Sequence, residues 1–405
     1  SVYIFRENEN LPIYIFMSII VSLFVGLTVS AEEIFRDRKM IKREHFLHLS
    51  RSSYLVAKIV VMIIISALQT TLFLAIATPM LGVKGLFGSY WIALFTTSLC
   101  ANMIGLNISS GFNSAITIYI VIPLLMIPMM VLSGAMFPFD KLNRQIGNVD
   151  KVPVIAELMP TRWTYEALMV KQAKDNEYDK RVYELKKKMS VADFNSVYRI
   201  SKLNEALDMC IEQEKNNATA NLEPKFDLLA NELDWLSYHH FAPPFEGIDS
   251  LTPELFTVSL GERVRKHLAE INDRFVRQSN NADDELDRYI AEFKNDLRRL
   301  FDNYHNDKLE EIVRKVYEPN KILEYRGRLI QNIDPIYQDP YPERPLEFRC
   351  HFFSPVKKIA GYTISTFTFN IALVLFSVII LYLLLYYETL SKIIKSIEKI
   401  RIQKR

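Results

Sequence analysis

The chain has 405 residues, a formal net charge of +2 and 49% hydrophobic residues. The near-neutral total hides a strong segregation: most of the charge lies in residues 140–358, and most of the apolar content lies in residues 11–137 and 359–387. This pattern excludes an ordinary soluble domain, whose helices would have one polar and one apolar face. It predicts an all-α membrane protein, for which we expect no nucleic-acid partner.

Five stretches are long and apolar enough to form transmembrane helices, because about 20 helical residues are needed to cross about 30 Å of hydrocarbon. We expect these spans at about residues 12–31, 55–81, 90–106, 115–137 and 361–387. The second span contains Lys58 near its start, where a long side chain can reach the interface. The fourth contains Pro123 and Pro128, which a helix bundle tolerates.

The basic residues predict the orientation, because Lys and Arg collect on the cytoplasmic side. The loop 32–54 and the tail 388–405 are the two richest basic segments, and five alternating spans place them on the same side. We therefore expect both basic segments on the cytoplasmic side of a bacterial inner membrane. Ser1 is then extracytoplasmic, and we expect a further span before it.

The predicted domains follow from these spans. Residues 1–137 form a bundle of four spans, residues 138–358 a large extracytoplasmic helical domain, residues 359–387 the last span and residues 388–405 a basic cytoplasmic tail. Within the large domain, apolar residues recur every three or four positions over 254–276 and 284–317, which is typical of amphipathic helices. We expect no β-structure there.

No catalytic constellation can be recognised. The sequence contains no G-x-x-x-x-G-K-[ST] phosphate loop, no H-E-x-x-H zinc motif and no defensible Ser-His-Asp set. We therefore expect no enzymatic activity, no metal and no cofactor in this chain. For the pair His239–His240, a surface or half-buried position is a better prediction than a metal site, because no third ligand lies at a suitable spacing.

Three cysteines are present. Cys100 lies within a predicted span, where a thiol packs as a small apolar side chain. Cys210 and Cys350 fall in the predicted extracytoplasmic domain, where an oxidising compartment permits a disulfide. Two free thiols are the alternative, because sequence spacing does not determine disulfide geometry.

The segment AEEIFRDRKMIKRE, residues 31–44, follows the first span and mixes charged with apolar residues. Ile34, Phe35, Met40 and Ile41 recur among the charges, which predicts a short amphipathic helix along the membrane interface over residues 32–44. A simple positively charged anchor is the alternative.

Three segments together resemble ABC exporter permeases of the G-subfamily type. EEIFRDRKMIKRE followed by SYLVAK resembles the coupling-helix region of that family, with matches at Glu33, Arg38, Arg43, Glu44 and Tyr54. IPLLMIPMMVLSGAMFPFDKLN, at 122–143, is similar to the fifth span and its exit. LMPTRWTYEAL, at 158–168, resembles a segment of bacterial members. The resemblance covers residues 11–168 and 359–405.

This resemblance implies a permease half that forms a homodimer in the lipid bilayer and is driven by nucleotide-binding domains, where ATP and Mg²⁺ bind. The ATPase domain and the first span of the family are missing from these 405 residues. The resemblance also implies that helix 32–44 couples the two parts, and the coupling residues are Glu33, Phe35, Arg38, Arg43 and Glu44.

By the same resemblance, the substrate path lies at the dimer axis between spans 12–31 and 115–137. Its candidate lining residues are Phe16, Ile20, Phe24, Met126, Met130 and Leu132. Helix packing or lipid contact is the alternative for these side chains. Ser133 and Gly134 are candidates for an outer gate.

The predicted function is ATP-driven export of a hydrophobic or amphipathic substrate. The alternative is a membrane-anchored helical module that binds an extracytoplasmic partner without transport, and the size of the outer domain favours it. A secondary transporter ranks last, because no ionisable residue suited to ion coupling lies within the spans.

Overall fold

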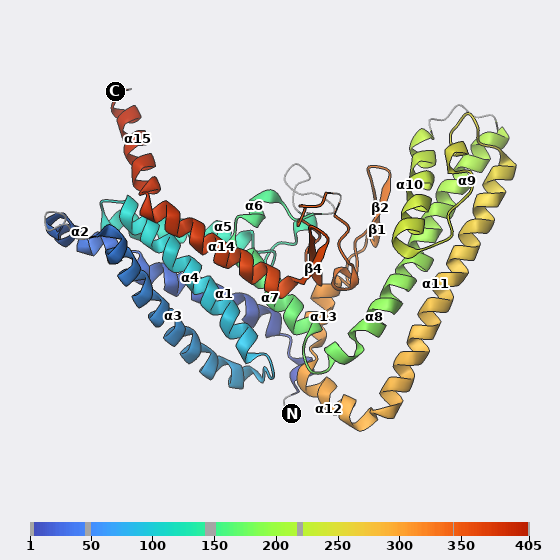
Figure 1. Ribbon diagram of the computed structural model, residues 1–405. Coiled ribbons are helices and arrows are strands. Elements are labelled where there is room, and N and C mark those ends of the chain that lie inside the picture. The colour runs from blue at the N-terminus through green and yellow to red at the C-terminus, as the bar shows by residue number, and fades with distance from the viewer. Residues whose placement is uncertain (1–3, 45–49, 142–150, 217–221, 343, 404–405) are drawn as a thin grey trace. The chain divides into compact units, whose positions relative to one another are not determined.

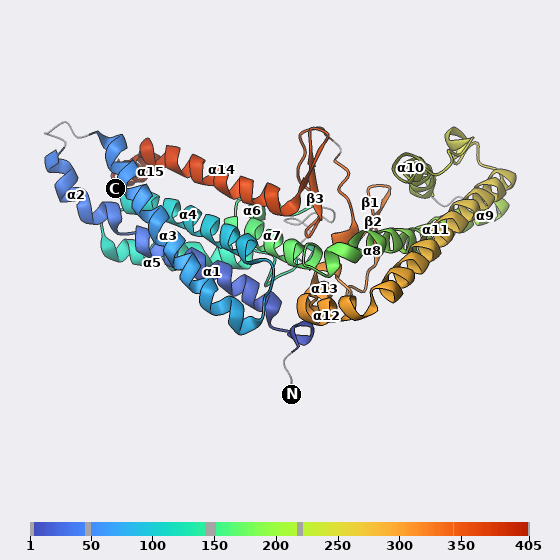
Figure 2. The same cartoon turned by 60° about the horizontal axis from the view of Figure 1, so that its bottom comes forward.

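The structure is a computed structural model that describes residues 4–44, 50–141, 151–216, 222–342 and 344–403 (Figure 1 and Figure 2). The chain divides into two compact units. The bundle unit comprises Ser1–Glu177, Asp302–Leu309 and Pro340–Arg405, and the insert unit comprises Tyr178–Phe301 and Glu310–Asp339. The described residues of 138–177 and 340–358, which the sequence prediction placed in the outer domain, thus belong to the bundle unit.

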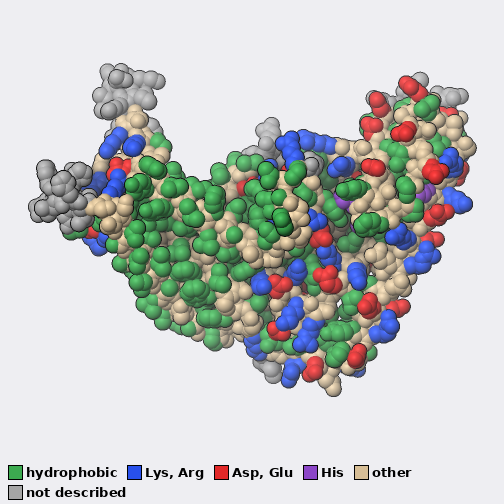
Figure 3. Space-filling model, in the orientation of Figure 1, with side chains coloured by type: hydrophobic (Ala, Val, Ile, Leu, Met, Phe, Trp, Pro, Cys, Tyr) green, Lys and Arg blue, Asp and Glu red, His purple; other side chains and the backbone are tan. Residues whose placement is uncertain are grey.

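Among the described residues, four helices of the bundle unit are long and apolar enough to cross a membrane. They are α1 (Leu11–Ser30), α3 (Arg51–Leu81), α4 (Phe87–Gly111) and α14 (Thr366–Tyr386). The candidate span that contains α1 extends through the first residues of α2, from Leu11 to Arg38. Figure 3 shows that hydrophobic side chains dominate the visible face of this bundle. The predicted span 115–137 forms a shorter apolar helix, α5 (Ala115–Val131), because the chain turns at Ser133 and Gly134.

Helix α4 is the centre of the bundle. It buries 78% of its most apolar window, whereas α3 and α14 each bury 22% of theirs. Two glycines allow α1 to approach α4 closely: a Cβ at Gly26 would lie 2.8 Å from the Ala101 Cβ, and a Cβ at Gly105 would overlap the Ser30 hydroxyl. Such contacts between small residues are the usual way in which membrane helices pack tightly.

The remaining elements of the bundle unit are short. They are η1 (Phe5–Glu7), α2 (Glu33–Glu44), η3 (Phe139–Lys141), α6 (Val154–Glu157), α7 (Pro160–Lys174), β3 (Val356–Ile359), β4 (Tyr362–Ser365) and α15 (Thr389–Gln403). Strands β3 and β4 pair antiparallel, with Val356 opposite Ser365.

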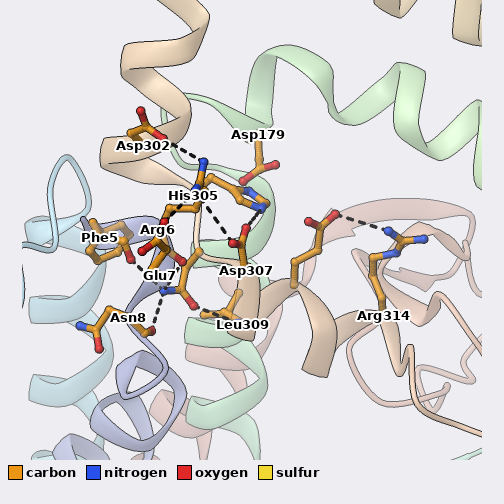
Figure 4. A network of polar contacts seen from close by, with 12 residues as sticks. Phe5, Arg6, Glu7, Asn8, Asp179, Asp302, His305, Asp307, Leu309 and Arg314 are labelled. Atoms are coloured by element: carbon orange, nitrogen blue, oxygen red, sulfur yellow. Dashed lines mark hydrogen bonds and ion pairs between the residues drawn. The ribbon is translucent and has the colours of Figure 1, made fainter. Parts of the chain in front are cut away.

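Residues Asp302–Leu309 belong to the bundle unit because they bind the segment that precedes α1. The side-chain amide of Asn306 donates to the carbonyls of Phe5 and Asn8 at 3.1 and 2.8 Å, and Arg6 forms an ion pair with Asp302 at 3.1 Å (Figure 4). Asn306 is 4% exposed, so these bonds are shielded from water.

The insert unit is mainly helical. Its elements are α8 (Asp179–Asp193), the π-helical segment η4 (Phe194–Arg199), α9 (Ile200–Asn216), α10 (Glu223–His240), η5 (Ile248–Ser250), α11 (Val258–Glu292), most of α12 (Lys294–Tyr304) and α13 (Asp307–Arg314), β1 (Ile322–Tyr325), β2 (Arg328–Gln331) and η6 (Pro335–Tyr337). Strands β1 and β2 pair antiparallel.

The core of the insert unit confirms one helical pattern and corrects another. All five apolar positions predicted for 254–276 are buried, namely Leu260, Val264, Leu268, Ile271 and Phe275. The predicted new helix at residue 284 is wrong, since α11 runs unbroken for 35 residues. The two hairpins, β1–β2 and β3–β4, were also missed, because each strand has only four residues, too few for a recognisable pattern.

Candidate functional site

Helix α2 is fastened to the end of α4 by its first turn. The Ser109 hydroxyl accepts hydrogen bonds from the backbone N–H groups of Ile34 and Phe35, at 3.0 and 2.9 Å. Such groups have no partner within their own helix and need an acceptor from elsewhere. Ser109 is fully buried, so this bond sets the point at which α2 leaves the bundle.

Arg38, one turn further along α2, binds the same end of α4. Its guanidinium donates to the backbone carbonyls of Ser110 and Ser109, at 2.8 and 3.3 Å, and to the side chain of Asn113. The last carbonyls of a helix have no partners of their own and carry partial negative charge, which favours a cation there. Arg38 also lies 5.8 Å from the centre of the Phe35 ring. The predicted coupling residues Arg38 and Phe35 are thus brought together.

The acidic side of α2 binds α3. The Lys58 ammonium lies 2.7 Å from carboxylate oxygens of both Glu33 and Asp37, and the Tyr54 hydroxyl donates to Asp37 at 3.1 Å. Glu33 and Asp37 are one helical turn apart on α2, and Tyr54 and Lys58 are one turn apart on α3. The pair on α2 therefore faces the pair on α3. Lys58 is therefore held by two carboxylates of α2.

The sequence prediction missed Asp37 and Lys58 as members of this group. The signal was present as two pairs with i,i+4 spacing, but nothing in the sequence shows that these faces meet. Of the other predicted coupling residues, Glu33 also pairs with Arg36 at 2.8 Å. Arg43 and Glu44 lie in the last turn of α2, where the side chains are outside the described part of the structure.

A further contact joins α3 to the end of α14. Arg51, at the start of α3, donates to the Leu385 carbonyl at 3.2 Å and pairs with Glu388 at 2.8 Å. Helices α2, α3, α4 and α14 are therefore tied together by polar contacts at one end of the bundle.

Most of the predicted substrate-path residues pack between helices of the same chain. Ile20 and Met126 are buried where α1 meets α5, and Phe16 and Met130 pack against the same cluster. Leu132 packs on a separate cluster that contains Phe139, Val152 and Ala156. These five side chains therefore make packing contacts within the chain, which was the alternative to lining a substrate path.

Phe24 is the exception, with 48% of its surface exposed. It belongs to a stripe on α1 whose other members are Ile13, Met17 and Val21, exposed by 61%, 52% and 43%. Spacings of four, four and three residues place these side chains on one helix face. Nothing in the described chain covers this face, which we call the α1 stripe.

Ser133 and Gly134 form the turn that ends α5. The Ser133 hydroxyl donates to the Met130 carbonyl at 2.7 Å and accepts from the N–H of Ala135 at 3.2 Å. Gly134 has a φ of +82°, and a Cβ there would lie 2.7 Å from the Phe352 ring and 2.8 Å from the Phe139 ring. Both conformation and space therefore require glycine.

A second polar cluster lies inside the bundle unit around Glu166 of α7. One carboxylate oxygen accepts from the Lys357 ammonium at 2.8 Å, and the other accepts from the Asn370 amide at 2.8 Å and lies 3.3 Å from the Arg162 guanidinium. The exposed fractions of all four side chains are 1% or less. Burial would raise the pKa of Glu166, but the charges of Arg162 and Lys357 hold it below its ordinary value.

This cluster, which we call the Glu166 cluster, joins three elements: α7, β3 and α14. It contains two cations and one carboxylate. Arg162 lies 3.8 Å from the centre of the Trp163 ring, a geometry in which the ring face offsets part of the charge. Lys357 also donates to the Cys350 sulfur at 3.1 Å. The segment LMPTRWTYEAL supplied Arg162 and Glu166, but the sequence prediction gave neither a role.

The disulfide considered between Cys210 and Cys350 is not formed, since all three cysteines are free and buried. Cys210 packs in the helical core of the insert unit, and Cys350 lies beside Lys357 in the bundle unit. Cys100 packs with Trp163 and Val374, as a small apolar side chain does.

Comparison with known protein families gives a match over the N-terminal part of the chain. The family model described as ABC-2 type transporter matches residues 2–172, which include α1 to α5 and most of α7. No curated protein and no solved structure matches the chain. The matched region holds both the α2 contacts and the Arg162–Glu166 pair.

Proposed function

We propose that this chain is the multi-pass permease half of a bacterial ABC exporter, because the family model of the ABC-2 type transporter matches residues 2–172. In this proposal two copies form a homodimer, and ATP and Mg²⁺ bind in nucleotide-binding domains outside this chain. The chain itself supplies no catalytic site and no cofactor. The G subfamily is the type that its motifs resemble.

The attachment of α2 to two helices is the observation that carries the proposal. A push on α2 reaches α4 through Ser109 and Arg38, and α3 through the Lys58 pairs. A helix held at both points passes on a displacement that a loose loop would absorb. ATP drives the cycle only if its binding favours one arrangement of the bundle over the other.

The membrane arrangement in this proposal has five spans. Helix α5 has 17 residues, about 26 Å at 1.5 Å per residue, which is at the lower limit for a span. The basic segments at α2 and α15 then lie in the cytoplasm. The insert unit lies outside the inner membrane, where it is available to an extracytoplasmic partner.

The α1 stripe is the surface that we assign to the second copy and to the substrate path. Its apolar side chains suit a hydrophobic or amphipathic substrate at the dimer axis. Of the residues first considered for the path, Phe24 remains in this role. The turn at Ser133 and Gly134, held by two aromatic rings, is the proposed outer gate.

The proposal can be tested in the complete transporter, with its ATPase, in lipid nanodiscs. A spin label is attached at Val21→Cys in both copies, since the native cysteines are buried. We expect one inter-copy distance that shifts when ADP and vanadate trap the ATPase. Lys58→Ala should abolish the shift while ATP is still hydrolysed, and Lys58→Arg should retain it.

The alternative function, a membrane-anchored module without transport, predicts another result. In that case the label distance does not respond to trapped nucleotide, or no second copy lies within range. Either result would overturn the exporter proposal. An unchanged shift in Lys58→Ala would leave the exporter standing and remove the role of the α2–α3 contact.

A further inference from the structure

The insert unit contains a pocket of about 460 Å³ that none of the features above explains. Its walls come from α8, η4, α11 and the segment 314–337, all within the insert unit. The volume lies within the range of small-molecule sites in proteins.

The pocket walls are mainly apolar and aromatic. The aliphatic and thioether side chains are Met189, Leu286, Val316 and Ile333. Three aromatic rings also line the pocket, Phe194, Tyr198 and Tyr337, and the first two stack with their centres 5.7 Å apart. These surfaces suit an apolar ligand body.

Lys186, Arg314 and Asp334 of the wall are held in ion pairs, and the wall carboxylate of Asp193 accepts a hydrogen bond from the Ser279 hydroxyl at 2.5 Å. Arg314 donates to Asp334 at 2.6 Å, and Ser190 donates to the other Asp334 oxygen at 3.0 Å. Lys186 lies 3.2 Å from Asp179 and 3.4 Å from Glu310. Burial would lower the pKa values of Lys186 and Arg314, but these carboxylates raise both, so the wall keeps fixed ion pairs.

Hydrogen-bond donors remain after this pairing. Tyr337 is 5% exposed, yet its hydroxyl has no hydrogen-bond partner among the described residues. The Tyr198 hydroxyl is also without one in the described part of the chain. Lys321 donates only to the Val316 carbonyl, at 2.8 Å, and has no carboxylate within ion-pair distance in the described ranges. Tyr198 and Lys321 are only partly buried, so these donors can meet either water or an acceptor of a ligand that enters the pocket.

The backbone is irregular on two sides of the pocket. Residues Phe194–Arg199 form a π-helix, which is rare and frequent at functional sites. Asp334 has a φ of +53°, an uncommon conformation for a residue other than glycine. Tyr198 lies in this π-helix, and both Tyr198 and Asp334 line the pocket.

We propose that this pocket binds an amphipathic organic anion, with its apolar chain against Met189, Leu286 and Phe194 and its carboxylate facing the donors of Tyr198, Lys321 and Tyr337. A carboxylate offers acceptors only, which matches the surplus of donors. The inference does not depend on transport, because the site lies wholly within the insert unit.

The test uses the full chain in lipid nanodiscs and decanoate carrying a diazirine near its end as the probe. After illumination, labelled peptides are identified by mass spectrometry. We expect labelling on α8, η4 and the segment 314–337, and we expect competition by unlabelled decanoate but not by decylamine or methyl decanoate. Mapping the labelled residues separates the pocket from the lipid-facing helices, which the probe also reaches.

Paired variants test the residues. Tyr337→Phe should weaken decanoate competition about tenfold, as expected for the loss of one hydrogen bond to a charged group, whereas Tyr317→Phe, outside the pocket, should not. Met189→Trp should abolish pocket labelling by filling the space, with the exposed Met209→Trp as its control. Pocket labelling that survives Met189→Trp, or equal competition by decylamine, would overturn the proposal.

Discussion

The carboxylate of Glu166 accepts a hydrogen bond from Lys357 at 2.8 Å, although 191 residues separate them in the sequence. Both side chains are buried, with exposed fractions of 0% for Glu166 and 1% for Lys357. The bond ties α7, which lies largely within the family-matched region, to a hairpin near the last apolar helix. The two parts of the bundle unit are thus joined by a charge pair shielded from water.

Glu166→Gln should therefore destabilise the bundle unit strongly. The amide keeps the size of the side chain but leaves Arg162 and Lys357 buried without a counter-charge, which costs about 3–5 kcal/mol in comparable cases. Thermal unfolding of the detergent-solubilised chain measures the effect. Glu347→Gln, which removes the partner of Lys151 at a partly exposed pair, is the control and should cost less than about 1 kcal/mol. Equal melting temperatures for the two variants would contradict the argument.

The Glu166 cluster also shows where prediction from the sequence stops. The apolar runs predicted the long helices, because length and hydropathy alone are enough for a span. The segment LMPTRWTYEAL, which contains Arg162 and Glu166, drew attention only through its resemblance to a family motif. Lys357 could not be predicted as their partner, because no local sequence pattern shows that the four-residue strand β3 contacts α7.

The same limit applies to α2. Its charged and apolar residues predicted the helix and its amphipathic character, and the family motif drew attention to Glu33 and Arg38. Ser109 could not be identified, because a serine at the end of an apolar helix is common. Only the folded bundle shows that its hydroxyl meets two N–H groups from a different helix.

Ser109→Ala should loosen the start of α2. The variant leaves the N–H groups of Ile34 and Phe35 without their acceptor, and loss of such a cap costs about 1 kcal/mol. Hydrogen exchange of the peptide that contains these amides should become about fivefold faster. Ser110→Ala is a matched control, because its hydroxyl bonds only within α4. If both variants exchange alike, the Ser109 contact does not hold α2.

Gly134→Ala should destabilise the turn after α5. A left-handed conformation costs a residue with a Cβ about 1–2 kcal/mol, and the clash with Phe352 adds to this. Gly88→Ala tests the opposite case, since a Cβ there meets nothing within 4 Å on a helix, and it should be neutral or stabilising by up to about 1 kcal/mol. The difference in melting temperature between the variants is the measurement. A Gly134→Ala protein as stable as Gly88→Ala would show that the turn adjusts freely.

The insert unit should lose stability in weak acid through His240. Its ring lies 4.9 Å from the Trp235 ring and 5.6 Å from the Phe275 ring. Burial, and then the nearby charge of Arg199, lower the pKa of His240 to about 4. In the unfolded chain the pKa is about 6.5. Between these values the unfolded state binds more protons, so stability falls as the pH falls from about 6.5 toward 4.

The expected loss from pH 7 to pH 5.5 is about 1–2 kcal/mol from this residue. Native-state hydrogen exchange in α10, corrected for the intrinsic rate at each pH, measures it. His240→Phe keeps an aromatic ring in the apolar site but cannot be protonated, so the pH dependence should flatten. His239→Gln, at the neighbouring position, should retain it. A pH dependence that persists in His240→Phe would assign the effect to another group.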